Sequence, residues 1–179
     1  MPNTKTAVFA NGCFWCTEGV FSMLKGVKSV APGYSGGTTA KPTYEQVSDG
    51  RTGHAEAIKI QYDPSVITYD DLLAVFFNTH DPTTLNRQGN DVGTQYRSAI
   101  FYGDDEQKKK AEDLVKELND THAYDKPVVT EVRPLDEFYE AEDYHHEYYA
   151  HNSDQPYCQL VIAPKLEKLQ KKFADLIKT

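Results

Sequence analysis

Two cysteines three positions apart carry the most reactive side chains of this sequence. They lie in the stretch N-G-C-F-W-C-T-E, residues 11–18, with a phenylalanine and the only tryptophan of the chain between them. Such a C-x-x-C pair can bind a metal, exchange electrons as a dithiol, or provide a single nucleophilic thiolate. A third cysteine, Cys158, stands alone much later in the chain. The residues around these thiols must decide between the three chemistries.

A zinc site is the first alternative. Structural zinc needs about four ligands, commonly two C-x-x-C pairs or one pair with two histidines. The sequence has one pair, Cys13 and Cys16, and a histidine-rich stretch H-H-E-Y-Y-A-H at residues 145–151. Its His146 and His151 are five apart, so they would diverge on a helix, and the pattern H-E-x-x-H is absent. A noncatalytic zinc- or peptide-binding domain remains the alternative to an enzyme, and about one zinc per purified chain would favour it.

A thioredoxin-like dithiol is the second alternative, because it also places C-x-x-C between a strand and a helix. That motif has an aromatic residue before the first cysteine and a small turn or a proline inside the pair. Here the aromatic residues, Phe14 and Trp15, lie inside the pair. Two rings beside a sulfur indicate a pocket for a small apolar group, although core packing explains either ring alone equally well.

Cys13 is expected at the first turn of a helix. Residues 6–10, T-A-V-F-A, predict a short buried strand, and Asn11-Gly12 predicts a sharp turn. Helical spacing then follows at Thr17, Val20, Phe21 and Leu24. The unpaired amides and the dipole at a helix N-terminus favour a thiolate. We therefore interpret Cys13 as a nucleophile, the alternative being a small buried apolar residue.

The elements that would position these residues mix strands and helices. Helices are predicted at 69–80, at 105–119, at 139–151, and near the C-terminus, where Leu166, Leu169, Phe173 and Leu176 share one face. Strands are predicted at 28–31, 55–62, 96–102 and 128–132. This mixture is typical of an α+β fold, a sheet with helices packed against it. The stretches 32–53 and 82–94 are too long for simple turns and predict functional loops.

The composition is that of an ordinary soluble globular protein. A chain of 179 residues with 39% hydrophobic and 26% charged residues suits one domain. A net charge of −8 argues against nonspecific binding to nucleic acid or to an anionic membrane. No stretch approaches the roughly 20 apolar residues that span a bilayer. Three cysteines, an odd number, favour free thiols in a reducing compartment, so we expect a cytoplasmic protein.

An ordered set of motifs resembles the peptide methionine sulfoxide reductase A family. G-C-F-W is followed by G-Y-S-G-G, P-T-Y, G-H-A-E-A, Q-G-N-D-V-G-T-Q-Y-R-S and A-E-D-Y-H, so the resemblance covers nearly the whole chain. It implies one catalytic domain over residues 1–179. The implied fold is α+β, a single-domain two-layer sandwich around a ferredoxin-like mixed sheet with long functional loops.

The same resemblance implies the reaction and the partners. The reaction is reduction of the S epimer of methionine sulfoxide, free or in oxidised proteins, which serves protein repair and oxidative stress defence. Thioredoxin is the implied external reductant, dithiothreitol can replace it, and no metal or organic cofactor is needed. We expect a monomer that binds neither nucleic acid nor membranes.

Position by position, the resemblance also implies roles for individual side chains. Cys13 matches the nucleophile, and Phe14 and Trp15 match the pocket for the substrate's S-methyl group. Tyr44 in P-T-Y and Tyr96 in T-Q-Y-R-S resemble the two phenols that hydrogen-bond the sulfoxide oxygen.

Two carboxylates complete the set. Asp91 in G-N-D matches the residue that orders the site and the substrate backbone, and Glu56 in G-H-A-E-A resembles the catalytic acid. Strand alternation supports the second role, because Glu56 would share a face with Ile58, Ile60 and Tyr62. Burial there would raise its pKa, as a proton donor near neutral pH requires. The alternative is a carboxylate at a strand end, paired with Arg51 or Lys59.

The identity of the resolving thiol stays open at this point. Cys158 in Q-P-Y-C resembles the family's resolving cysteine, but Cys16 stands where many members have glycine. Residues 152–156 before Cys158 are polar and show no helical or strand pattern, so this segment could swing toward a sulfenic acid. We predict Cys158 as the resolving thiol and Cys16 as a backup or second relay thiol.

Overall fold

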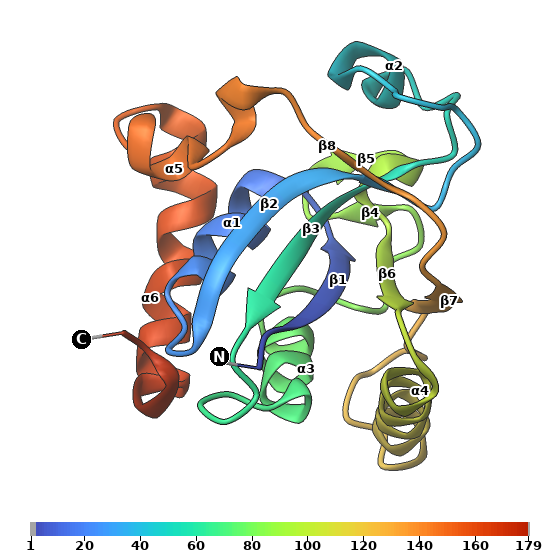
Figure 1. The fold of residues 1–179 in the computed structure, drawn as a ribbon, viewed down its shortest axis with the longest axis vertical. Coiled ribbons are helices and arrows are strands. Elements are labelled where there is room, and N and C mark those ends of the chain that lie inside the picture. Colours follow the sequence, from blue (N-terminus) through green and yellow to red (C-terminus); the bar gives the residue numbers. More distant parts are fainter. Residues whose placement is uncertain (1–2, 179) are drawn as a thin grey trace.

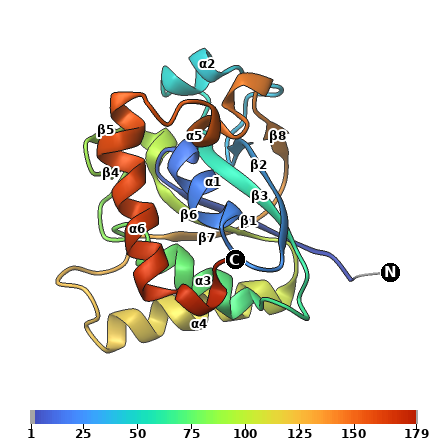
Figure 2. The same ribbon diagram turned by 90° about the vertical axis from the view of Figure 1, so that its left-hand side faces the viewer.

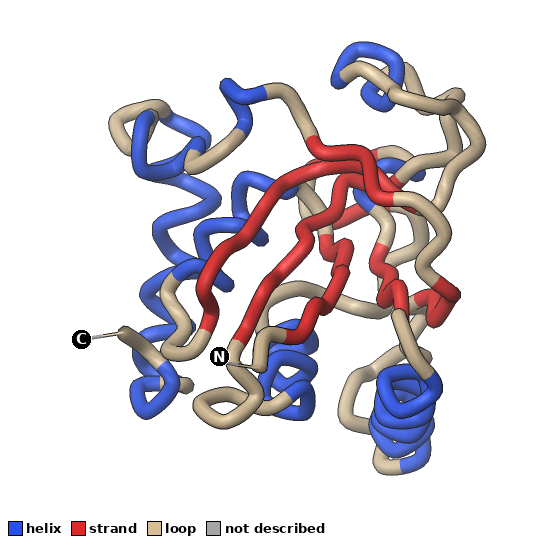
Figure 3. The backbone as a smooth tube through the Cα atoms, in the orientation of Figure 1, coloured by secondary structure: helices blue, strands red, loops and turns tan. Residues whose placement is uncertain are grey.

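The computed structural model describes residues 3–178, which form one mixed α/β domain around a twisted six-stranded sheet (Figure 1, Figure 3). The strand order is β7-β6-β1-β3-β2-β8; neighbours are antiparallel except β6 and β7, which are parallel. The strands are β1 (Lys5–Asn11), β2 (Val27–Ser35), β3 (Ala55–Tyr62), β6 (Ser98–Tyr102), β7 (Glu131–Pro134) and β8 (Phe138–Glu140). A second, two-stranded sheet pairs β4 (Arg87–Gln88) with β5 (Asp91–Val92).

The helices connect and cover this sheet. Figure 2 shows α6 beside α1 and α4 beside α3. The helices are α1 (Phe14–Ser22), α2 (Tyr44–Ser48), α3 (Tyr69–Asn78), α4 (Asp105–Asp120), α5 (Tyr148–His151) and α6 (Ala163–Lys172). Within residues 3–178, none of them is long and apolar enough to cross a membrane.

Strand alternation divides the core between the two faces of the sheet. On β1, Phe9 points to one face, where its ring lies 5.6 Å from Phe21 of α1 and 5.0 Å from Phe76 of α3. Both crossover helices therefore pack on the same side. Val8 and Ala10 point to the other face, into a smaller cluster with Phe101. The predicted period of two in the strands is thus what separates the two clusters.

The crossovers place the ends of three strands next to one another. Helix α1 leads from β1 to β2, which lie on either side of β3, and α3 leads from β3 to β6. Capping boxes start two helices: Thr68 and Asp71 at α3, and Thr43 and Gln46 at α2. In this strand order, the end of β1, the start of β3 and the start of β6 lie next to one another at one end of the sheet.

One prediction about local structure is wrong. Residues 139–151 do not form one helix: they contain the end of β8, a 3-10 turn at Asp143–His145, and the short α5. The reason is tertiary, because β8 pairs with the edge of β2, and Glu147 takes a left-handed conformation that interrupts a helix.

The segment 152–156, expected to lack regular structure, is irregular over residues 152–155, and a helical turn begins at Pro156. Cys158 begins a π-helical turn, Cys158–Ile162, that continues directly into α6. The sheet with packed helices and the strand at 55–62 are confirmed. The two long stretches hold short elements of their own, α2 in one and the β4–β5 pair in the other.

Candidate active site

Cys13 lies at the junction of β1 and α1, as the sequence predicts. Gly12 has φ +110°, and a Cβ at this position would lie 2.9 Å from Gln88 Cγ, so both the turn and the close approach require glycine. Cys13 is the N-cap residue of α1, and its carbonyl accepts from Cys16 N and Thr17 N. The side chain of Cys13 is buried.

The three cysteines form one cluster although Cys158 is distant in sequence. Cys13, Cys16 and Cys158 are all buried and free, and they pack with Ile162 of the π-helical turn. Tyr157 lies beside them: its hydroxyl is 3.7 Å from Cys16 Sγ and donates to Asp91 Oδ2 at 2.9 Å. The β4–β5 pair and the start of the last helix therefore meet over the first turn of α1.

The pKa values of Cys13 and Cys16 differ from the expectation that Cys13 carries the thiolate. Burial raises the pKa of Cys13 well above its usual value, and the hydrogen bond with Cys16 and the charge of Glu56 raise it further. The hydrogen bond from Cys13 lowers the pKa of Cys16 to about 7. The expectation that the helix N-terminus favours a thiolate on Cys13 is therefore wrong, because Cys13 is buried and lies close to another acid.

Glu56 is a buried acid with a strongly raised pKa. Its side chain is 1% exposed, and its Oε1 accepts the backbone N–H of Phe14 at 3.1 Å. Its Oε2 has no partner within residues 3–178. Burial raises its pKa to about 8, and the charges of Asp91 and Cys16 act in the same direction. The alternative pairing with Arg51 or Lys59 is wrong, because Arg51 pairs with Asp49 and Lys59 Nζ lies over the ring of Phe138.

Both predicted tyrosines face the same site. Tyr44 begins α2, and its ring lies 6.2 Å from that of Phe14. Burial raises its pKa to about 12, and Glu56 and Cys13 contribute. Tyr96 ends a 3-10 turn and packs against the cysteine cluster; burial, then the charge of Glu56, raises its pKa above the ordinary value. Both phenols therefore keep their protons and can donate hydrogen bonds at neutral pH.

The two aromatic side chains predicted to form a pocket, Phe14 and Trp15, are held by residues far along the chain. Trp15 Nε1 donates to His145 Nδ1 at 3.0 Å. The ring of Tyr148 stacks on Trp15 with 3.8 Å between centroids and 9° between planes. Phe14 is fully buried, 5.0 Å from the ring of His145. One edge and one face of Trp15 are thus in contact with residues 145–148, which lead into α5.

Sequence reasoning did not assign roles to three residues of this site. Tyr157 contacts a thiol and Asp91, His145 holds Trp15, and Glu142 accepts from both Tyr34 OH and the backbone N–H of Tyr44. The signal was present, because these residues belong to Q-P-Y-C and A-E-D-Y-H. Nothing local in those motifs shows what their side chains touch.

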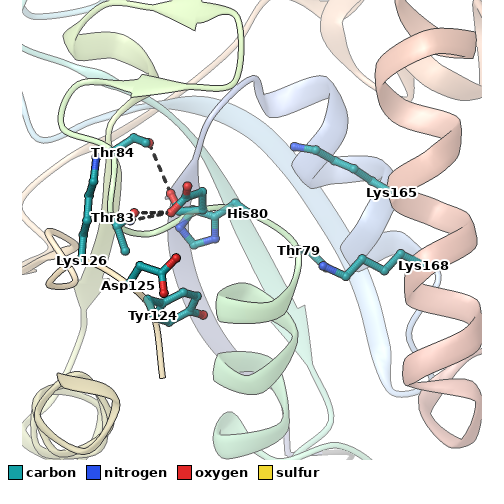
Figure 4. A pocket seen from close by; sticks show the side chains of 10 residues that line it. Thr79, His80, Thr83, Thr84, Tyr124, Asp125, Lys126, Lys165 and Lys168 are labelled. Atoms are coloured by element: carbon teal, nitrogen blue, oxygen red, sulfur yellow. Dashed lines mark hydrogen bonds between the residues drawn. The ribbon is translucent and has the colours of Figure 1, made fainter. Parts of the chain in front are cut away.

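A basic cleft of about 550 Å³, lined by three lysines, lies between α6 and the segments that follow α3 and α4 (Figure 4). Lys165 and Lys168 reach into it from α6, opposite His80 and residues 124–126. Lys165 adds to the lowering of the Cys16 pKa that the hydrogen bond from Cys13 begins. Among residues 3–178, no three His, Cys, Asp or Glu side chains are arranged to hold a metal ion.

Comparison with known proteins gives the family. The profile described as "Peptide methionine sulfoxide reductase" matches residues 5–177. The chain belongs to this family. It is 57% identical over 171 residues to peptide methionine sulfoxide reductase MsrA of Sulfolobus acidocaldarius, covering 96% of both chains. The MsrA of Saccharolobus solfataricus is 54% identical over 174 residues, covering 97% of each.

Solved methionine sulfoxide reductases have the same fold. Methionine sulfoxide reductase A of Corynebacterium diphtheriae is 37% identical with a TM-score of 0.81, covering 86% of this chain and 77% of that one. Reduced Mxr1 of Saccharomyces cerevisiae is 34% identical with a TM-score of 0.79, covering 87% and 89%. Mxr1 in complex with Trx2 is 25% identical with a TM-score of 0.55, covering 81% and 84%. The chain is thus a thiol-dependent oxidoreductase that reduces methionine sulfoxide.

Proposed function

We propose that Cys13 reduces the S epimer of methionine sulfoxide at a site formed by Glu56, Tyr44 and Tyr96. The observation that carries this proposal is a buried acid with a pKa of about 8 beside a buried thiol and two protonated phenols. A sulfoxide becomes a good electrophile only when its oxygen is protonated or strongly hydrogen-bonded. Phe14 and Trp15 form the wall that accepts the S-methyl group. Asp91 orients the substrate backbone once Tyr157 releases it.

In the first step, sulfur is reduced and the thiol is oxidised. Glu56 gives its proton to the sulfoxide oxygen, and the Cys13 sulfur attacks as its own proton passes to the Cys16 thiolate. The oxygen, now a hydroxyl, passes from the substrate sulfur to the Cys13 sulfur: the sulfur–oxygen bond of the substrate breaks, a sulfur–oxygen bond to Cys13 forms, and Cys13 becomes a sulfenic acid. Methionine leaves. The hydrogen bond between Cys13 and Cys16 supports this path for the proton.

In the second step, Cys158 resolves the sulfenic acid. Its thiol forms a disulfide with Cys13 and the hydroxyl leaves as water. The packing of Cys158 against the other two thiols supports this assignment. The contact of Cys16 with Cys13 makes a Cys13–Cys16 disulfide the competing product, with Cys16 then serving as a relay thiol.

A thioredoxin returns the enzyme to the reduced state by disulfide exchange, with no metal or organic cofactor. The structure of Mxr1 in complex with Trx2 supports such a partner. Mxr1 in an unusual oxidized form superposes on this chain with a TM-score of only 0.62, against 0.79 for the reduced form. This difference supports a rearrangement between redox states. The three free thiols support the proposal that the enzyme acts in a reducing compartment, the cytoplasm.

The fold itself supports a further assignment. The order β6-β1-β3-β2, with α1 and α3 as crossovers, is consistent with the ferredoxin-like unit that the sequence predicts. The single domain over the whole chain remains part of this proposal.

A single-turnover assay tests the nucleophile. Cys13→Ser is expected to release no methionine from the S epimer, while the wild type releases about one equivalent without added reductant. The R epimer, run in parallel, should give no product with either protein. Methionine release by the mutant at the wild-type rate would remove Cys13 from the mechanism. Circular dichroism of both proteins checks that the fold is unchanged.

A further inference from the structure

Glu18 is a second buried acid near Cys13, and the proposed reaction does not use it. It lies on α1 and is 3% exposed. Its Oε1 accepts the backbone N–H of Tyr148 at 3.3 Å, across to α5. Its Oε2 has no partner within residues 3–178. A carboxyl buried with half of its hydrogen-bonding capacity unused costs stability compared with an apolar side chain, so stability does not explain it.

The hydrogen bond that Glu18 accepts from Tyr148 N holds a strained turn. Glu147, the residue before Tyr148, has φ +52° and ψ +38°, a left-handed conformation that is unfavourable for a residue with a side chain. The backbone N–H groups of both Glu147 and Tyr148 are directed at the Glu18 carboxyl. An acceptor on α1 therefore stabilises two consecutive amides of this turn. Without it, the turn has no side-chain cap of its own at α5.

The turn decides where the Tyr148 ring lies. That ring stacks on Trp15 at 3.8 Å and 9°, the closest and most parallel aromatic pair of the described residues. Trp15 is three positions before Glu18, so the two side chains lie one helical turn apart on α1. The same helix thus carries the pocket wall and the residue that brings a second ring against it.

We propose that Glu18 is a positioning residue that fixes the S-methyl pocket: it anchors the Glu147 turn and so holds Tyr148 against Trp15. The role of the pocket in catalysis rests on the proposed function. The positioning of Tyr148 against Trp15 does not rest on it, because the stacking can be measured without turnover. Tyr148 then sets the width of the pocket and its preference for a small apolar group.

Tryptophan fluorescence tests the structural part, because Trp15 is the only tryptophan. Glu18→Ala is expected to shift the emission to longer wavelength, because the indole loses the Tyr148 ring and gains water. Tyr148→Ala should give the same shift. Glu18→Gln keeps a carbonyl oxygen that accepts the two amides, so it should restore the wild-type emission. Glu167→Gln, on the other side of the cleft between α1 and α6, is the matched control and should leave emission unchanged.

Steady-state kinetics test the functional part. Glu18→Ala should raise KM for a methionine sulfoxide peptide by roughly 3- to 10-fold, the effect of losing one aromatic contact, with kcat nearly unchanged. Glu18→Gln should recover most of this affinity. The double variant with Tyr148→Ala should be no worse than Tyr148→Ala alone, because both act through one ring.

The outcomes separate this proposal from the proposed function. An unchanged Trp15 emission in Glu18→Ala, or additive effects in the double variant, would overturn the positioning role. If Glu18→Ala does not fold, Tyr148→Ala still tests whether the ring controls emission and KM; no change in either would also overturn it. A shifted emission in Glu18→Ala, together with a wild type that releases no methionine, would support the positioning of Tyr148 and refute the proposed function instead.

Discussion

Glu56 at the start of β3 and Glu18 on α1 are alike in burial and in hydrogen bonding. Both are almost fully buried, and each has one oxygen bonded to a backbone N–H of another element, Phe14 for Glu56 and Tyr148 for Glu18. Each second oxygen lacks a partner among the described residues. They differ in what they face. Burial of a carboxyl is therefore not a catalytic feature by itself; the groups around it decide its use.

The groups that shift the pKa differ between Glu56 and Glu18. Burial raises both pKa values, and for Glu56 the charges of Asp91 and Cys16 raise it further, to about 8. For Glu18, two backbone amides and His146 oppose the rise. Glu56 thus keeps a proton at neutral pH next to the thiols. Glu18 is an acceptor for amides.

The largest expected difference between Glu56 and Glu18 appears when both are replaced by glutamine. Glu56→Gln cannot give a proton, so it should slow the reductase step by roughly 10²-fold or more. Glu18→Gln still accepts the amides and should slow it less than about threefold. Methionine release in a single turnover at pH 7 measures both. Equal losses at the two positions would mean that neither is the acid.

The resolving thiols give the next largest effect. Cys158→Ser should still release about one methionine per chain in a single turnover, but lose roughly tenfold or more of thioredoxin-driven recycling. Cys16→Ser should recycle at a substantial fraction of the wild-type rate, because Cys158 remains. Peptide mapping of wild-type enzyme after one turnover is the direct check. A sole Cys13–Cys16 disulfide would exchange the roles of the two thiols.

The pH profile of the reductase step sharpens the role of Glu56. The rate should fall about tenfold per pH unit above 8, as Glu56 loses the proton it must donate. It should fall similarly below about 7, as the Cys16 thiolate that accepts the Cys13 proton becomes protonated. Single-turnover rates from pH 5 to 10 give both limbs. Glu56→Gln should lose the upper limb, whereas Glu18→Gln should keep it.

The smallest effect concerns the basic cleft. Lys165→Gln removes a positive charge near Cys16 and should raise the pKa of the Cys16 thiol slightly, because Lys165 is only one of the groups that lower it. Lys168 lines the same cleft but is not among the groups that shift the pKa of Cys16, so Lys168→Gln is the control. Iodoacetamide alkylation of Cys16 against pH measures the shift. Equal shifts in both variants would contradict a specific effect of Lys165.

Much of the site follows from short-range patterns. Period-two alternation puts Glu56 on the apolar face with Ile58 and Ile60, and the structure buries it there. The strand, the Asn-Gly turn and the helical spacing place Cys13 at the start of α1. The family motifs indicate Tyr44, Tyr96, Asp91 and Cys158, and the structure brings all four around that turn. Their catalytic roles stay predictions.

Other features depended on contacts between distant segments. The sequence by itself determined which residues are reactive and which faces of β1, β3 and α1 are apolar, because alternation and helical spacing are local. Only the tertiary structure decided that the Cys16 thiol ionises before Cys13, that Tyr157 joins a thiol to Asp91, and that Glu18 supports Tyr148. Burial and Coulomb interactions depend on atoms brought together across the fold, and a pKa or a strained turn is set by those neighbours and not by position along the chain.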